Sequence, residues 1–186
     1  CFNLPWDTRD NDQVTERFGD DAFVKSLGRH YADANRTMGQ NNSGSFDHGL
    51  TYGYEWFEVD GGMQDYANYY RQSTHATVEL GTQKRPIAAS LGRYWQENEE
   101  SLLSFLEQGV HGFFLTVRGS DGAIPETLQL MDGTRQMSYQ NGVIQRPHAG
   151  PSAPVTISAA GYLPMTISLT PRPFADRFDE LVLQKN

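Results

Sequence analysis

Hydrophobic and polar residues follow two different periods along the chain, and the change falls near residue 108. Apolar residues first recur at helical spacing in residues 21–35, from Met63 to Tyr70, and in residues 89–108. Short strand-like runs follow at 110–118, 127–131, 135–139, 155–160, 165–169 and 177–183. Asp-Gly, Asn-Gly and proline-rich turns separate these runs, as in a small antiparallel β-sandwich. We therefore expect two domains, residues 1–108 and 109–186.

The segment from His75 to Leu80 alternates between polar and apolar residues, which predicts a β-strand. Ala76 and Val78 point to one side, and Glu79 lies on the polar side near the carboxyl end. Ligands collect at that edge of open α/β sheets, so Glu79 is a candidate general base. From spacing alone, the alternative is a solvated glutamate at the end of a strand.

The helix predicted at residues 21–35 carries an apolar stripe of Phe23, Leu27, Tyr31 and Ala34 that we expect to face the core, and two further helices also have an apolar face. In the shorter helix, which follows the Gly61-Gly62 turn, the stripe contains Met63, Tyr66 and Tyr70. In the longer helix the stripe consists of Leu91, Trp95, Leu102 and Leu106, and we expect Trp95 to be a core residue and not a binding aromatic. Glutamates occupy the opposite, solvated side of the longer helix.

Composition and charge narrow the functional classes. The 186 residues carry a formal net charge of −8, which argues against a nucleic-acid partner. No long apolar run is present, so we expect no membrane span. The single cysteine, Cys1, excludes an intrachain disulfide. Residues 36–48 are rich in Asn, Gly and Ser and predict a surface loop, in which Asn41-Asn42-Ser43 is a glycosylation sequon for a eukaryotic secreted protein.

The run Gly61-Gly62-Met63-Gln64-Asp65-Tyr66, followed by Val78-Glu79-Leu80, resembles the active-site loop, helix and strand of the N/E-type zinc metallocarboxypeptidases. These hydrolases release residues from peptide C-termini. The resemblance implies that Glu79 is the general base acting on a zinc-bound water. It also implies that Asp7 and Gln64 form the pocket for a C-terminal Lys or Arg. Phe57 stands where the family usually has a substrate-binding tyrosine, whose hydroxyl it lacks.

The resemblance also sets expectations for the domains. Residues 1–108 resemble the C-terminal part of the α/β catalytic domain, a mixed sheet with helices. The turn Ala159-Ala160-Gly161-Tyr162 resembles one in the transthyretin-like (prealbumin-like) domain that follows it in the family, which implies that fold for residues 109–186. On residues alone, Asp7 is equally explained as a turn cap, and Gln64 and Asp65 as caps of a helix N-terminus.

The family's zinc ligands, which include a His-x-x-Glu motif, have no match in this chain. The histidines show no metal-binding spacing; they are His30, His48, His75, His111 and His148. We therefore expect zinc in the complete family enzyme, no metal ligand in this chain, and no activity from the chain alone.

Two functional hypotheses remain open at this stage. In the first, the chain is part of a zinc-dependent carboxypeptidase that releases C-terminal Lys or Arg. In the second, it is a non-catalytic remnant or pseudoenzyme that acts as a transthyretin-like binding or assembly module. Either would need the N-terminal half of the catalytic domain or self-association, since an incomplete sheet leaves apolar surface and a strand edge unpaired. We expect a secreted or periplasmic location, with the cytoplasm as the alternative.

Overall fold

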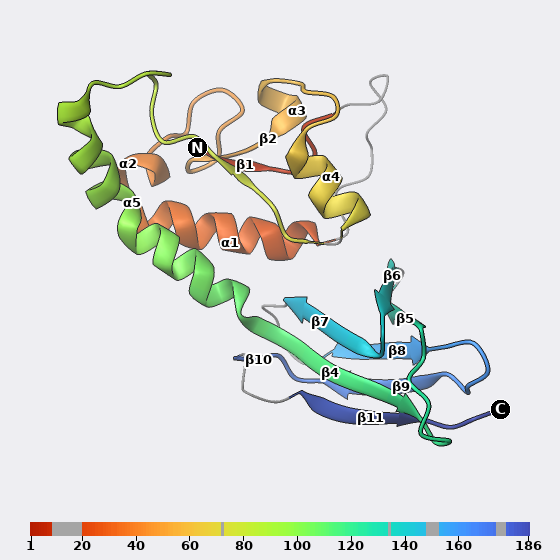
Figure 1. The fold of residues 1–186 in the computed structure, drawn as a ribbon. Coiled ribbons are helices and arrows are strands. Elements are labelled where there is room, and N and C mark those ends of the chain that lie inside the picture. Colours follow the sequence, from red (N-terminus) through yellow and green to blue (C-terminus); the bar gives the residue numbers. More distant parts are fainter. Residues whose placement is uncertain (9–19, 72, 134, 148–152, 174–177) are drawn as a thin grey trace. The chain divides into compact units, whose positions relative to one another are not determined.

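The computed structural model describes residues 1–8, 20–71, 73–133, 135–147, 153–173 and 178–186. The chain forms two compact units, Cys1–Gln108 and Gly109–Asn186. The first mixes helices and strands, and the described part of the second is built from strands (Figure 1). None of the helices in the described ranges combines the length and apolar character that a membrane span needs.

The sheet of the first unit is short and mixed, in agreement with the predicted α/β character. Its strands, in spatial order, are β2 (Leu50–Tyr52), β1 (Phe2–Leu4) and β3 (Thr77–Val78). The central strand β1 runs parallel to β2 and antiparallel to β3. The predicted strand from His75 to Leu80 is thus only two residues long, and Glu79 lies directly after it.

The helices described alongside this sheet are α1 (Asp21–Ala34), α2 (Arg36–Gly39), α3 (Gly53–Trp56), α4 (Met63–Tyr70) and α5 (Ala88–Gly109). Helix α1 packs against one face of the sheet, where Phe2 and Leu4 are almost completely buried. A methyl group on Gly28 of α1 would lie 2.7 Å from Phe2 Cδ1 and 3.2 Å from Leu50 Cδ2. A residue without a side chain therefore lets helix and sheet approach closely.

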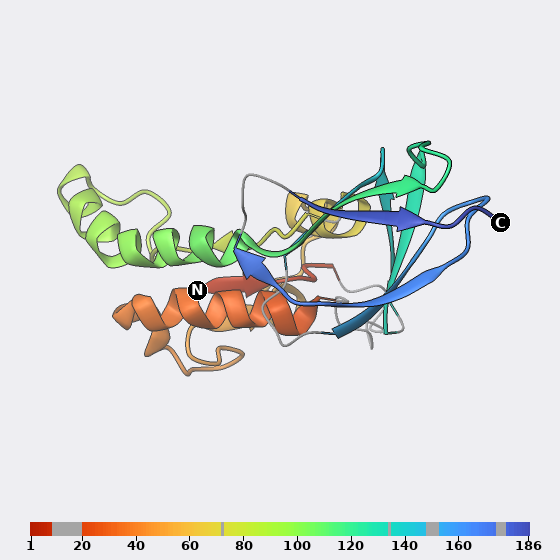
Figure 2. The same cartoon turned by 90° about the horizontal axis from the view of Figure 1, so that it is seen from below.

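Helix α5 is attached to α1 by polar side chains. The Tyr31 hydroxyl and Asn35 Nδ2 both donate to Asn98 Oδ1, each at 2.9 Å. Ser101 Oγ donates to the Tyr31 carbonyl at 2.8 Å. The two helices lie side by side in Figure 2. Because these polar groups are buried and paired, they hold the two helices together without an unpaired-group penalty.

The expectation that Trp95 of α5 is a core residue is wrong, since Trp95 is 56% exposed. The buried residues of α5 are Asn98 and Ser101, and those of α4 are Gln64, Asp65 and Asn68. The apolar stripes are exposed instead, and contain Met63, Tyr66, Tyr70, Leu91, Trp95, Leu102 and Leu106. Periodicity identified the apolar face of each helix correctly, but the buried side chains of both helices are polar, and Phe105 of α5 packs against Phe2 of the core from a position outside the stripe.

The second unit contains two four-stranded sheets. One has the order β10-β4-β11 with β7 also paired to β4, and the other has the order β6-β5-β8-β9. The bounds are β4 (His111–Gly119), β5 (Thr127–Asp132), β6 (Arg135–Gln140), β7 (Val143–Pro147), β8 (Ala153–Ser158), β9 (Met165–Leu169), β10 (Arg172–Pro173) and β11 (Asp179–Leu183). One hydrophobic cluster draws residues from both sheets: Leu115, Val117, Leu128, Leu130, Met137, Ile144, Val155, Ile157 and Leu183.

Two features of this unit differ from the predicted antiparallel sandwich. Strand β11 pairs with β4 in parallel. Strand β7 was not predicted, and it follows the Asn141-Gly142 turn, where both residues have positive φ. This turn resembles a hairpin signal, yet β6 pairs with β5 and β7 pairs with β4. The turn therefore carries the chain from one sheet to the other.

Candidate functional site

A buried carboxylate with two amide neighbours lies just beyond β1. Asp7 is only 7% exposed. Its Oδ1 accepts hydrogen bonds from Asn3 Nδ2 at 2.7 Å and from Gln64 Nε2 at 3.1 Å. Both neighbours are also buried. We name Asn3, Asp7 and Gln64 the Asp7 cluster.

The backbone around Asp7 is held by a second carboxylate. Asp65 Oδ1 and Oδ2 accept from the Asp7 amide at 2.9 and 3.1 Å, and Oδ2 also accepts from the Thr8 amide at 2.9 Å. The Asp7 carbonyl in turn accepts from the Val59 amide at 3.1 Å. A methyl group on Gly53 would lie 2.0 Å from Asp7 Oδ1, so the site requires a glycine there.

These contacts correct one reading of the sequence. The N-cap of α4 is Gly62, and no side chain caps that helix end. Gln64 and Asp65 therefore do not act as helix caps. Gln64 contacts the Asp7 carboxylate, and Asp65 binds the backbone that carries Asp7.

The surroundings of Asp7 disfavour an unpaired negative charge on its carboxylate. Burial raises the pKa of Asp7 as the main cause, the hydrogen bond from Asn3 lowers it, and the negative charge of Asp65 raises it. Two further oxygens, Asn3 Oδ1 and Gln64 Oε1, are buried and have no hydrogen-bond partner among the described residues. A hydrogen-bond donor that reached these oxygens would satisfy them, and a positive charge beside Asp7 would lower the cost of ionising the carboxylate.

Glu79 lies on the same sheet face as the Asp7 cluster. Its amide donates to the Cys1 carbonyl at 2.8 Å, and the Cys1 α-amino group donates to the Glu79 carbonyl at 2.7 Å. Cys1 and Asn3 alternate with Phe2, whose side chain is buried in the core that includes α1. Cross-strand partners share a face, so Glu79 and Asn3 both lie on the face away from α1. Glu79 lies opposite Cys1, which is two residues before Asn3 in the chain. Two residues of a strand span about 7 Å, so Glu79 and Asn3 are separated by about that distance along the strand direction.

The structure does not bring every predicted site residue into contact. The Glu79 side chain is exposed, and no hydrogen bond joins it to the Asp7 cluster in the described ranges. Phe57 follows α3, its ring is 70% exposed, and its amide donates to the Gly53 carbonyl at 2.7 Å. The loop that carries Phe57 is nevertheless tied to the cluster through the bond between Val59 and Asp7.

Sequence reasoning missed Asn3 and the anchoring role of Asp65. A polar residue between Phe2 and Leu4 is a signal that could have identified Asn3, because it must lie on the other face of that strand. No comparable signal links Asp65 to the backbone of Asp7, which is 58 residues away in the sequence.

The residues of this site do not match a zinc centre. The Asp7 cluster offers one carboxylate and two amides, whereas zinc prefers thiolates, imidazoles and carboxylates. Within the described ranges, no three His, Cys, Asp or Glu side chains lie close enough together to hold a metal ion. His148 lies outside the described residues.

Comparison with known proteins decides the family. A family model described as zinc carboxypeptidase matches residues 1–101, more than half of the chain. The chain belongs to the zinc carboxypeptidase family. This confirms the resemblance found in the motifs around Gln64 and Glu79.

Individual carboxypeptidases match most of the chain. Carboxypeptidase D from Anas platyrhynchos is 33% identical over 178 residues, which cover 88% of this chain and 13% of that protein. Carboxypeptidase D from Rattus norvegicus is 32% identical over 184 residues, 91% of this chain and 13% of that protein. The Rattus norvegicus carboxypeptidase N catalytic chain is 29% identical over 174 residues, 90% of this chain and 38% of that protein. The chain therefore spans only a small part of these relatives.

The anchoring of Asp7 by Asp65 predicts a large stability effect in this zinc carboxypeptidase chain. Asp65→Asn removes the charge of the carboxylate that accepts three hydrogen-bond contacts from backbone amides. It also replaces one acceptor oxygen with a donor NH2 group. We expect a loss of about 2–3 kcal/mol, since hydrogen bonds to charged groups each contribute about 1.5–3 kcal/mol. Urea unfolding of the 186-residue chain measures it. The control is Asp33→Asn at an exposed position of α1, and a similar small change in both variants would contradict the anchoring role.

Proposed function

We propose that this chain is the part of a zinc carboxypeptidase that recognises a basic C-terminal residue of a peptide, Lys or Arg. The observation that carries the proposal is the buried Asp7 carboxylate with the unpaired oxygens of Asn3 and Gln64 beside it. A guanidinium or ammonium group offers several donors and a positive charge, which complement these acceptors.

The same arrangement would reject other C-terminal residues. A neutral side chain in the pocket would leave the Asp7 carboxylate buried and uncompensated. Truncating one partner of a buried charge pair costs about 2–5 kcal/mol. This corresponds to a preference of roughly 30-fold to several thousand-fold for a basic over a neutral C-terminal residue. The pocket is therefore proposed to set specificity and not only affinity.

We propose Glu79 as the general base of the hydrolysis. Support comes from its family motif and from its position on the sheet face that carries Asn3. The zinc of the family is proposed to be held by ligands outside these 186 residues, so the chain alone is expected not to hydrolyse peptides. Residues 1–108 would form the C-terminal part of the catalytic domain, and residues 109–186 a transthyretin-like domain.

The exposed apolar stripes of α4 and α5 support a partner. Large apolar surfaces on soluble proteins mark interaction sites. We propose that a further segment of the same catalytic domain covers them, because the first relatives are far longer than the matched region. The proposed location is secreted or periplasmic.

The chain alone is expected to self-associate through these stripes. Trp95→Gln combined with Leu106→Gln should shift the population toward monomer, because both apolar side chains are exposed on α5. Sedimentation velocity over a concentration series measures this, with Glu100→Gln on the same helix as control. A stable, monodisperse monomer of the unchanged chain would contradict the need for a covering segment.

The function is tested in a chimera. The 174 matched residues of the rat carboxypeptidase N catalytic chain are replaced by the corresponding part of this chain, and the folded protein is supplied with zinc. We expect release of Arg and Lys from peptide C-termini. A folded, zinc-loaded chimera that releases neither would contradict the enzymatic proposal and favour a non-catalytic binding or assembly module.

Phe57 is expected to limit this activity. Phe57→Tyr in the chimera should raise kcat/KM about fivefold, since one added hydrogen bond to substrate contributes about 1 kcal/mol. The ring is exposed, so the added hydroxyl has room. Steady-state kinetics measure the gain, with Phe57→Leu as the control that adds no hydroxyl. No gain, or equal effects of both substitutions, would argue against a substrate-binding role for this position.

A further inference from the structure

The chain contains two N-glycosylation sequons, Asn35-Arg36-Thr37 and Asn41-Asn42-Ser43, only six residues apart. Both have a permitted residue at the middle position, so the sequence does not separate them. The structure does, because the two asparagines lie in very different environments.

Asn35 is part of the packing between helices. It is 4% exposed, and its Nδ2 donates to Asn98 Oδ1 of α5 at 2.9 Å. Its Oδ1 accepts from the Met38 amide at 3.0 Å and caps α2. A sugar on Nδ2 would put a bulky, hydrated group between α1 and α5 and alter the donor to Asn98. A glycan at Asn35 is therefore incompatible with this fold.

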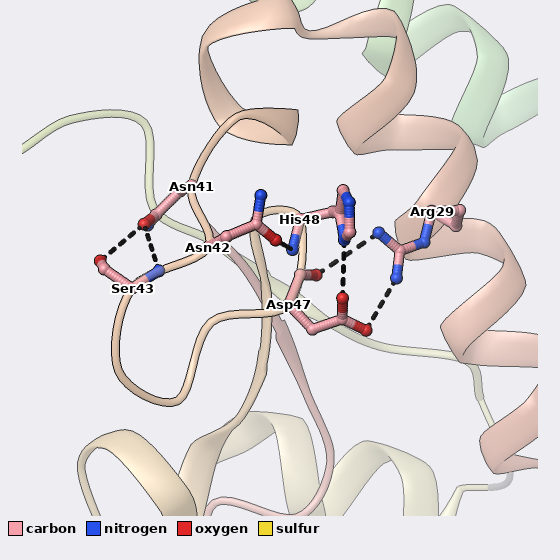
Figure 3. Close-up of polar contacts among 6 residues, drawn as sticks. All are labelled: Arg29, Asn41, Asn42, Ser43, Asp47 and His48. Carbon is pink, nitrogen blue, oxygen red and sulfur yellow. Dashed lines mark hydrogen bonds and ion pairs between the residues drawn. The ribbon is translucent and has the colours of Figure 1, made fainter.

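Asn41 lies in the surface loop that follows α2. Its Oδ1 accepts from Ser43 Oγ at 2.9 Å and from the Ser43 amide at 3.4 Å, so the sequon hydroxyl already contacts the acceptor side chain (Figure 3). Asn42 and Ser43 are exposed. No protein acceptor for Asn41 Nδ2 is found among the described residues. A substituent on that nitrogen would displace no described hydrogen bond.

The rest of the loop is held by contacts that do not use the Asn41 amide nitrogen. Asn42 Oδ1 accepts from the His48 amide at 2.8 Å. Asp47 pairs with Arg29 Nη2 at 2.9 Å and with His48 Nδ1 at 2.7 Å. Figure 3 shows this ion-pair group on the side of the loop away from Asn41 and Ser43. A glycan on Asn41 is thus compatible with the loop structure.

We propose that Asn41 is the acceptor for an N-linked glycan in the folded chain and that Asn35 is not. The co-substrate is a lipid-diphosphate-linked oligosaccharide. Asn41 Nδ2 loses a proton and forms a bond to the anomeric carbon, while the bond from that carbon to the diphosphate oxygen breaks and the lipid diphosphate leaves. This inference goes beyond the proposed peptidase function and holds whether or not the chain takes part in hydrolysis.

The test is secretion of the full 186-residue chain from a eukaryotic host, behind a supplied signal peptide. Supplying the leader separates acceptor competence from the natural location of the protein. Intact-mass measurement before and after peptide N-glycosidase treatment detects the glycan, and peptide mapping locates it. Three variants are compared, Asn41→Gln, Ser43→Ala and Thr37→Ala. Translation with microsomes provides a second measurement that does not depend on secretion.

We expect the unchanged chain and Thr37→Ala to carry one glycan on Asn41 after secretion, and both Asn41→Gln and Ser43→Ala to lose it. Three results would overturn the proposal. They are loss of the mass shift in Thr37→Ala, a glycan mapped to Asn35 in folded secreted protein, and no modification of Asn41 in either system.

Discussion

Replacing Asp7 with asparagine in the chimera should lower kcat/KM for peptides ending in Arg by at least about 100-fold, and should change it far less for peptides ending in a neutral residue. The variant keeps the size of the side chain but removes the charge that would pair with the substrate. Loss of one partner of a buried charge pair costs about 2–5 kcal/mol. Steady-state kinetics with matched Arg and Leu peptides measure the change in preference.

The pH dependence of the same reaction tests the role of the Asp7 charge independently. The pKa of folded Asp7 is raised, chiefly by burial. A raised pKa means that the carboxylate becomes neutral at a higher pH than an exposed aspartate does. The preference for Arg should therefore decline as the pH falls through this raised pKa, before exposed carboxylates titrate.

Asp33→Asn is the control, because that carboxylate is exposed on α1. An equal loss for Arg and Leu peptides in Asp7→Asn would indicate a purely structural role for Asp7. An unchanged preference would show that the pocket for the basic residue lies elsewhere.

Glu79→Gln in the chimera should lower kcat by about 10²–10⁴-fold with little change in KM, which is the usual contribution of a general base. Stability should change little, because the side chain is exposed and the hydrogen bonds to Cys1 use the Glu79 backbone. Single-turnover kinetics and urea unfolding measure the two quantities. Glu100→Gln, at an exposed position of α5, is the control. A kcat within threefold of the parent would, by the same principle, remove Glu79 from the proposed chemistry.

The sequence predicted those features that depend on local patterns. The Gly61-Gly62 turn correctly placed the start of α4, and the apolar spacing of residues 21–35 gave α1 almost to its ends. The mixed α/β character of the sheet in residues 1–108 was implied by the family resemblance. Family motifs added the candidate site residues, which spacing alone left ambiguous.

The features that could not be predicted depend on long-range contacts. Asp7 and Gln64 meet although they are 57 residues apart in the sequence, and no local pattern encodes that pairing. Helices α4 and α5 show the limit most clearly. Their periodicity located the apolar stripes, but it says nothing about what covers them, and the residues buried inside the unit include Gln64, Asp65 and Asn98 instead.

The central claim is that Asp7 forms a pocket for a cationic side chain. It is tested most directly by peptide binding to the 186-residue chain, detected through the NMR signals of the Asn3 and Gln64 side-chain amides. Two peptides are titrated that differ only in the last residue, arginine or its neutral isostere citrulline. We expect the arginine peptide to shift the signals of both amides and the citrulline peptide to shift them much less. In Asp7→Asn we expect neither peptide to shift them. Equal shifts with both peptides, or arginine-dependent shifts that persist in Asp7→Asn, would contradict a cation pocket at Asp7.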